Sequence, residues 1–513
     1  MRQVLWTLFL RSAGLQSRVI GLRTPRRGTE VPRYEGLKYA VSLFLAIALT
    51  GCARPPKLPA YATPTAPSAP AWDTPAPWRP SDPKDAIPKG EWWTVFHDDE
   101  LSDLVKHAVT ANQTIDLARA QYMQARALTG LALSALYPQV AIGGLVQDQR
   151  LAGTRAGGGG TAANQATFSV TPTVSYEVDL FGKRVQSIES AQATLQSSAA
   201  QLENATLIVT AEVASDYFTL RRIDTEIGIL ARSVESFTRA LELVRNRHDG
   251  GIASGLDVAQ EEALVASTRT EATLLRQQRD AFEHAIAVLV GQPAPLFHLA
   301  SRDLTVEPPA IDTGLPTDLL ERRPDIAGAE RQVDAANARI GVARSAYFPS
   351  IGLFGSGGLL SGNLWKILDV PSLVWGVGAA VTQELFTGGA RKAQMDFAQA
   401  GFDAAVAGYR QSVLQALAEV EDDLSGLVVL NDARATQTDA VAAATRALDI
   451  ANDRYIGGLV TSLDVVTAQQ TLLANQRLAA QIQGERLVTT VQLIKALGGG
   501  WDASSLAAAR VKR

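Results

Sequence analysis

The chain has 513 residues, a formal net charge of −4 and 46% hydrophobic residues. Residues 1–51 carry eight Lys/Arg and two Asp/Glu, so the remainder carries a net charge of −10, which argues against a nucleic-acid-binding body. The five histidines show no metal-ligand spacing, and no Ser/His/Asp or Cys/His arrangement occurs. We therefore expect no metal, no cofactor and no catalysis.

The N-terminal region has the features of an export signal. An apolar run at residues 40–49 follows Lys38, and it is too short to span a membrane. The run ends in Leu49-Thr50-Gly51-Cys52, which resembles the lipobox of bacterial lipoproteins. This resemblance implies cleavage before Cys52, acylation of that residue and, because Ala53 follows, sorting to the outer membrane. We assign residues 1–51 as a signal region whose Arg-rich start indicates a start codon placed too far upstream.

The next segments are a tether and two helices. Residues 52–90 carry the candidate lipid anchor and are rich in Pro, Ala and Thr, which predicts an extended tether. The body begins with the run Glu91–Phe96, and apolar spacing from Leu101 predicts a helix. An Ala-rich helix is predicted from about Thr114 to Leu136, because Pro138 follows it.

Two strands are predicted after these helices. Pro138–Gln149 is a candidate strand, and in Thr167–Leu180 apolar residues alternate with polar ones, which predicts one apolar and one polar face. Fourteen alternating residues exceed an ordinary strand and are enough for a tilted membrane strand of ~9–11 residues. Pro172 is unexpected there, because proline has no N–H and cannot donate a hydrogen bond to the ladder.

A long heptad pattern fills Lys183–Arg247. With Val185 as the first a position and Ile188 as the first d position, fifteen of the eighteen a and d sites are apolar. A helix of this length would measure roughly 95 Å, and a repeat kept this long makes helices supercoil around partners. Glycines in Arg247–Gly255 predict a turn, and a return helix follows to about Val290.

The second half of the chain repeats the first. A shift of 207 residues places Asp257 on Asp464, and further upstream a shift of 211 residues places Gly144 on Gly355. The alternating strand recurs at Trp375–Val381 in the same phase. Copies of this length are too long for solenoid repeats, so they indicate a duplicated half-domain. The predicted boundaries are repeat 1 at 91–291, a linker at 292–313, repeat 2 at 314–499 and a tail at 500–513.

The strand count bears on assembly. Each copy offers two strands, so the chain has about four. A sheet with free edges cannot span a membrane, and eight strands form about the smallest barrel. The chain therefore either oligomerises or does not span the membrane.

Several motifs resemble one family. Gly314–Ile326, together with Tyr347-Phe348-Pro349-Ser350, is similar to the signature of TolC-type outer-membrane efflux factors, in the NodT lipoprotein branch of resistance-nodulation-division systems. Tyr176–Gly182 resembles the matching strand-to-helix signature of the first copy. The resemblance covers about residues 90–500. It implies an α+β fold and a homotrimer with a twelve-stranded outer-membrane β-barrel above a periplasmic α-barrel of long helices.

The same resemblance implies a function. It predicts a passive duct of a tripartite efflux pump for drugs or other small molecules, with a periplasmic adaptor and an inner-membrane pump as partners. A type I protein-secretion duct or a metal-efflux duct remains an alternative within this class, although only three methionines occur, which weakly disfavours a copper or silver route. A non-channel envelope scaffold lipoprotein is the alternative from another class, and the alternating strands favour the duct.

Candidate functional residues follow from the family pattern. The run Arg322–Asp325 is expected to be a solvated, charged turn at a helix start, with Pro324 at the first helical position and no transport role. The family closes its periplasmic end with helix–turn–helix tips, and the residues matching its gate pattern are Asp464, Arg454 and Tyr455. The residues resembling adaptor-docking tips are Gly250, Gly251, Ile252, Gly457, Gly458 and Leu459. Asp464 and Asp257 are also placed to cap helices, and capping is preferred for Asp257.

Overall fold

The computed structural model describes residues 62–67, 72, 91–152, 163–309, 311 and 322–501. All of them belong to one unit formed by residues 54–513. The signal region with Cys52, most of the tether, part of the linker and most of the C-terminal tail lie outside the described residues.

The helices and strands recur at the predicted shifts. The first copy contains, in order, η1 (Trp92–Phe96), α3 (Asp99–Ala111), α4 (Gln113–Ser134), β1 (Gln139–Leu151), β2 (Ala163–Val178), α5 (Lys183–Asp249), α6 (Gly255–Leu289) and η2 (Ala294–Leu296). The second contains α8 (Pro324–Ser345), β3 (Ser350–Ser361), η4 (Leu364–Lys366), η5 (Val370–Ser372), β4 (Leu373–Thr382), α9 (Ala390–Ile456) and α10 (Ser462–Ala496). Adding 211 to the bounds of α4 gives those of α8, and adding 207 to α5 and α6 gives α9 and α10. The duplication therefore holds to the residue for these three helices of each copy.

Within the described residues, the four strands form one antiparallel sheet in the order β1-β2-β3-β4. The register places most of the large apolar side chains of the four strands on one face, since Val146 pairs with Phe168, Val170 with Leu359 and Leu359 with Leu373. This face is open to its surroundings: Val146 and Trp375 are 77% and 78% exposed. The predicted alternation is confirmed, and β2 begins four residues earlier and ends two residues earlier than predicted.

Pro172 is accommodated by a local gap in the ladder. On its β3 side, pairing runs to Val170 and resumes at Thr173, and Pro172 lies in the interval. Gly358 of β3 sits against the carbonyl of Val170, where a Cβ atom would clash. The ladder with β3 is thus interrupted at Pro172, and a glycine lets the two strands approach there.

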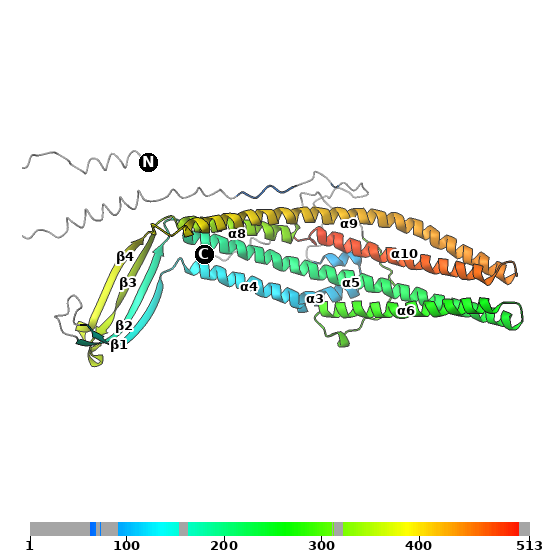
Figure 1. Ribbon diagram of the computed structural model, residues 1–513, viewed down its shortest axis with the longest axis horizontal. Helices are drawn as coiled ribbons and strands as arrows, with labels where there is room; N and C mark the ends of the chain where they lie inside the picture. The colour runs from blue at the N-terminus through cyan, green and yellow to red at the C-terminus, as the bar shows by residue number, and fades with distance from the viewer. Residues whose placement is uncertain are drawn as a thin grey trace, which may run out of the picture. The chain divides into compact units, whose positions relative to one another are not determined.

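The long helices α5 and α9 have 67 residues each, or about 100 Å, and Figure 1 shows each running from the sheet to a hairpin turn. The predicted d stripe of α5 is its buried seam. Seven of its nine members are buried: Ile188, Leu195, Val209, Ile223, Leu230, Phe237 and Val244. Only three a positions are buried, namely Val213, Leu220 and Leu241. The a positions therefore lie mainly at the rim of the seam.

The main hydrophobic core lies midway along the long helices. There η1 packs on α5, with Phe96 and Phe218 ring centroids 4.9 Å apart, and Trp92 Nε1 donates to Thr210 Oγ1 at 3.3 Å. Ile286 of α6 and Leu493 of α10, both fully buried, close the same core. In the part of the chain that the structure describes, every helix is too short or too polar to cross a membrane.

The start of α8 corrects one expectation. Pro324 occupies the first helical turn as predicted, but Arg323, expected in a solvated turn, is only 7% exposed. Its guanidinium pairs with Asp325 and Glu419, each at 2.7 Å, and donates to the carbonyl of Ala496 at 3.0 Å. Arg323 is buried because it ties the start of α8 to α9 and to the end of α10.

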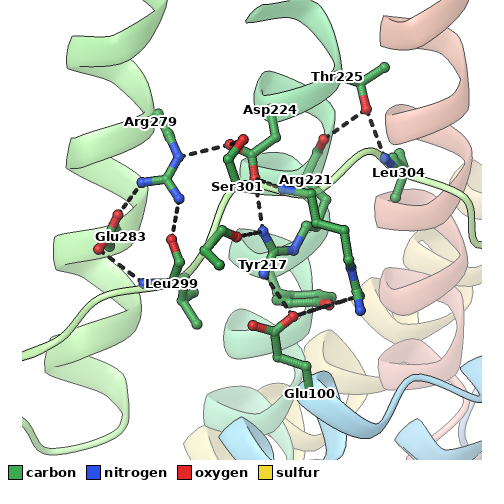
Figure 2. Close-up of polar contacts among 12 residues, drawn as sticks. Glu100, Tyr217, Arg221, Asp224, Thr225, Arg279, Glu283, Leu299, Ser301 and Leu304 are labelled. Carbon is green, nitrogen blue, oxygen red and sulfur yellow. Dashed lines mark hydrogen bonds and ion pairs between the residues drawn. The ribbon is translucent and has the colours of Figure 1, made fainter. Parts of the chain in front are cut away.

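A buried ionic network fixes the segment that follows α6 (Figure 2). Its centre is Asp224 of α5, which is 2% exposed and accepts from Arg221 Nη1 and Arg279 Nε, both at 2.8 Å. The same carboxylate accepts from the Ser301 hydroxyl at 3.0 Å and the Arg302 N–H at 3.2 Å. A charge this deeply buried is tolerable only because two guanidiniums and two further donors surround it.

The two arginines of the network reach beyond Asp224. Arg221 binds Glu100 of α3 at 2.8 Å, and Arg279 also pairs with Glu283. Both donate to backbone carbonyls of the segment after α6, at Ala300 and Leu299. The segment is thereby held between α3, α5 and α6 by its backbone, which makes it part of the rigid frame around the long helices.

Candidate functional site: the paired helical tips

Both long helices end in the same glycine turn. At the end of α5, Gly251 adopts φ +73°, and the N–H of Ile252 donates to the carbonyl of Arg247 at 2.8 Å. At the end of α9, Gly458 adopts φ +71°, and the N–H of Leu459 donates to the carbonyl of Arg454 at 2.9 Å. The left-handed residue is glycine in both turns because a side chain is strained there.

Both return helices begin with a capping box. The N–H and the hydroxyl of Ser254 both donate to Asp257 Oδ2 at 2.8 Å, and the N–H of Asp257 donates to Ser254 Oγ at 3.3 Å. In α10, Thr461 donates in the same way to Asp464 Oδ2, at 3.0 and 2.9 Å. Each carboxylate also lies near the positive end of its helix dipole. The two acids therefore both cap helices, including Asp464, for which a gate role was also predicted.

Arg247 joins the two tips. Its guanidinium donates to the carbonyls of Tyr455 and Ile456 at 3.0 and 3.2 Å and lies 4.5 Å from the centre of the Tyr455 ring. These contacts cross from the end of α5 to the end of α9. Of the predicted gate residues, the structure thus places Tyr455 in a contact between hairpins, but its partner is Arg247 and not Arg454.

A second contact joins the same hairpins. The hydroxyl of Ser462, which is buried at the start of α10, donates to Asp257 Oδ1. The hydrogen bond from Ser462, with those from Ser254, lowers the pKa of the Asp257 carboxyl. Asp257 therefore caps its own helix with one oxygen and holds the other hairpin with the second.

The remaining predicted gate residues face outward. Asp464 and the side chain of Arg454 are exposed. Sequence reasoning missed Arg247 and Ser462, although one signal for Arg247 was present, since the shift of 207 residues places it on Arg454. The structure leaves Asp464 and Arg454 free to meet groups outside the chain.

The tips also present exposed apolar side chains. Ile252 and Leu459, from the predicted docking turns, are 78% and 72% exposed. Three further residues beside them are also exposed: Leu256, Ile456 and Leu463. Apolar side chains gathered on an exposed surface are typical of a contact site for another protein.

The arrangement suits the joining and separation of the two hairpins. The tips carry capping carboxylates and an arginine bound to carbonyls, and among the described residues no His, Cys, Asp and Glu group is placed to hold a metal ion. Long helical hairpins attached to membrane-length strands with an exposed apolar face define an outer-membrane channel subunit.

Comparison with known proteins gives the family. The model of the outer membrane efflux protein family matches residues 104–292 and 315–499, and the chain belongs to that family. It is the outer-membrane channel component of an efflux pump, with the TolC-like fold that the sequence motifs predicted. Members of this family are channels and not enzymes.

Similar proteins span almost the whole chain. The pyoverdine export outer membrane protein OpmQ of Pseudomonas aeruginosa is 34% identical over 435 residues, which are 83% of this chain and 90% of OpmQ. The toluene efflux pump outer membrane protein TtgF of Pseudomonas putida is 32% identical over 472 residues, 90% of this chain and 97% of TtgF. The solved outer-membrane channel OprN is 29% identical, has a TM-score of 0.80, and covers 86% of this chain and 99% of its own.

Proposed function

We propose that three copies of this chain form a passive duct for small organic molecules, fed by an inner-membrane pump through a periplasmic adaptor. One observation carries the proposal: the described strands form a single sheet with a continuous apolar face and two free edges. The strands have 10 to 16 residues, long enough to cross the outer membrane when tilted. Three such sheets joined edge to edge make twelve strands, which removes every free edge and leaves the apolar faces to lipid.

The substrate class rests on the relatives. OpmQ is named for pyoverdine export and TtgF for toluene efflux, so small organic molecules are favoured over a secreted protein or a metal ion. The scaffold alternative is disfavoured by the sheet, because a soluble scaffold would not leave Val146, Trp375 and Val377 each more than three-quarters exposed.

Acylation of Cys52 would anchor each subunit beside its barrel. Thr63 donates to Glu330 of α8, and the 11 residues from Cys52 to Thr63 span at most about 36–40 Å. From Glu330 to Ser345, where α8 ends below β3, the distance is about 22 Å. The tether is therefore long enough for the lipid to reach the membrane surface at the base of the sheet.

The tips would form the periplasmic gate. Inside one chain, Arg247 holds Tyr455 and Ile456 through their carbonyls. The shift of 207 residues relates Arg247 to Arg454, and it relates Tyr455 and Ile456 to His248 and Asp249. Arg454 of one subunit would then bind the carbonyls of His248 and Asp249 of the next subunit. A ring of alternating contacts would close the duct, and separation of the tips would open it.

The exposed apolar turns would dock the adaptor. Ile252 and Leu459 stand at the two tips of each chain, so a trimer would present six such turns in a ring. A partner with six matching apolar grooves would bury them without touching the gate arginines, which lie on the helices behind the turns.

Two measurements test this proposal together. Mass measurement in detergent should give a trimer, and the purified protein should conduct ions in planar bilayers. A stable monomer with intact helicity, or a trimer without conductance, contradicts the duct and revives the scaffold.

A further inference from the structure

A hollow of about 880 Å³ lies where the helices meet the sheet. Sites for small molecules commonly measure roughly 300–1,000 Å³. Residues of α4, α5, α8 and α9 all line the hollow, and these four helices pack side by side in that order as they reach the sheet (Figure 1). A hollow that touches four neighbouring helices lies on one face of their layer, and that face decides what can enter it.

The ends of the strands identify this face. Glu177 of β2, Ser350 of β3 and Thr382 of β4 line the hollow. Glu177 pairs with Gly352, which lies two residues from Ser350. Ser350 in turn pairs with Thr382, so the three side chains share the polar side of the sheet. In the proposed barrel the apolar side meets lipid, and the hollow therefore borders the duct.

The two sides of α8 agree with this placement. Arg339 lines the hollow, whereas Glu330, nine residues earlier, accepts a hydrogen bond from Thr63 of the tether. Nine residues make about two and a half turns of an α-helix, which puts the two side chains on opposite sides of α8. The tether leads to the proposed lipid anchor, outside the barrel. Arg339 therefore faces the duct.

Arg339 offers the hollow a free positive charge. Its side chain is exposed, and among the described residues its guanidinium has no hydrogen-bond or ion-pair partner. Two carboxylates of the lining are already engaged. Glu177 pairs with Lys183 at 3.2 Å and with Arg184 at 3.3 Å, and Asp179 accepts from the first N–H groups of α5 at 3.0 and 3.1 Å.

The remaining carboxylate of the lining lies at the sheet. Glu384 is exposed and follows the end of β4 by two residues. Arg339 lies six residues, or about 9 Å, before the end of α8. The hollow is thus negative at the sheet and positive further along α8, so it favours an anionic group at the end that holds Arg339.

Two stacked rings form an aromatic wall between these ends. Phe181 and Phe348 both line the hollow, with ring centroids 4.5 Å apart and an interplanar angle of 9°. Phe181 belongs to the connection from β2 to α5, and Phe348 belongs to the connection from α8 to β3. The pair therefore lies at the middle of the helix layer, where α5 packs on α8. Phe181 is 43% exposed, which leaves apolar ring surface for another flat ring.

We propose that this hollow binds small aromatic molecules that carry a negative charge, with the anionic group at Arg339 and the ring against Phe181 and Phe348. This inference rests on the proposed duct and names a class of molecule that the duct holds during passage. The planar guanidinium matches a carboxylate with two parallel hydrogen bonds. Arg339 and the ring pair belong to the central helices and connections of one chain, so each chain carries a complete site.

Block of the ion current in planar bilayers tests the site, with 2-naphthoate as the probe and neutral 2-naphthamide as its uncharged analogue, each added to both chambers. The parent channel should be blocked more strongly by 2-naphthoate. Arg339→Gln should raise the half-blocking concentration of 2-naphthoate about tenfold, and that of 2-naphthamide less than about twofold, because only the carboxylate loses a charged partner. Phe181→Leu keeps the apolar bulk and loses the ring, so it should raise both values about threefold.

The matched control is Lys392→Gln, which removes one positive charge from an exposed position on α9 outside the lining. It should shift the 2-naphthoate value less than about twofold, because an exposed charge at a distance is screened. Arg339→Lys keeps the charge and should fall between the parent and Arg339→Gln.

The outcomes separate the site from the duct. A channel that conducts but is blocked equally by both probes, or equally in the parent and in Arg339→Gln, overturns the site and leaves the duct standing. An equal shift in Lys392→Gln and Arg339→Gln also overturns the site, because the effect is then one of net charge. A protein that does not conduct overturns the duct and the site with it.

Discussion

Replacing Arg247 by alanine should weaken the closed gate. Its guanidinium makes two hydrogen bonds to carbonyls, at 3.0 and 3.2 Å, and lies over the ring of Tyr455. At about 1 kcal/mol for each hydrogen bond of a half-buried group and about 0.5–1 kcal/mol for the cation–π contact, the loss is about 2–3 kcal/mol per chain. This corresponds to a factor of roughly 30–150 in the ratio of joined to separated tips.

Single-channel recording in planar bilayers measures this ratio as the fraction of time spent open. The matched control is Arg245→Ala, two residues away, where an exposed ion pair with Glu262 is worth about 0.5 kcal/mol, so about a twofold change is expected. Arg247→Lys keeps the positive charge but loses the planar guanidinium that reaches both carbonyls. The channel of this variant should therefore have a larger open fraction than that of the parent protein. Equal open fractions in Arg247→Ala and Arg245→Ala refute the assignment of Arg247 to the gate.

Three further predictions concern the anchor, the frame and pH. Cys52→Ser should abolish incorporation of radiolabelled palmitate yet leave trimer assembly intact; equal labelling rules out the anchor. Asp224→Ala leaves two guanidiniums without their shared partner and should lower the free energy of unfolding by about 3–5 kcal/mol. The loss should appear as faster hydrogen exchange of the Arg302 amide, which donates to Asp224. The control, Asp303→Ala at an exposed position, should change this exchange little. Burial raises the pKa of Glu261 to about 7. Stability is then lost as pH rises from the unfolded value of 4.5 through 7, so Glu261→Gln should raise the melting temperature at pH 8 and have little effect at pH 5. A gain of the same size at both pH values contradicts a titrating Glu261.

The periodic parts of the fold were predictable because periodicity reports burial directly. The heptad located the start of α5 at Lys183 and its seam through the d positions, and the alternation located both faces of β2. The shift of 207 residues also carried one copy onto the other with matching element bounds. These signals are local, because each depends on which side of one helix or strand faces the core.

The contacts that hold the tips and the frame were not predictable in this way. Arg247 meets Tyr455 across 208 residues of sequence, and a heptad says nothing about which hairpin lies beside which. Arg323 was expected in solvent because arginine in a turn is usually exposed, but its acceptors on α9 and α10 appear only when the chain is folded. Asp224 likewise gives no signal in the sequence, since its four donors come from three separate segments.

The last prediction uses the difference between the two copies at the tips. Inside the chain, Ser462 donates to Asp257, and the shift of 207 residues relates this pair to Gly255 and Asp464. At the proposed subunit boundary, Asp464 of one copy therefore faces a glycine of the next copy and lacks the hydroxyl. A Cβ atom at Gly255 would lie 3.9 Å from His248, so a side chain fits there.

Gly255→Ser should supply that hydroxyl and lower the open fraction about fivefold per boundary, as expected for one added hydrogen bond of about 1 kcal/mol. Gly255→Ala also gains helix propensity over glycine, by more than serine does, and it lacks the hydroxyl, so it is the matched control. The effect of the serine must also depend on its acceptor. In a double-mutant cycle, Gly255→Ser should close the gate further in the parent protein but not beside Asp464→Ala. Serine and alanine variants with the same open fraction would show that Asp464 caps its helix and takes no part in the gate.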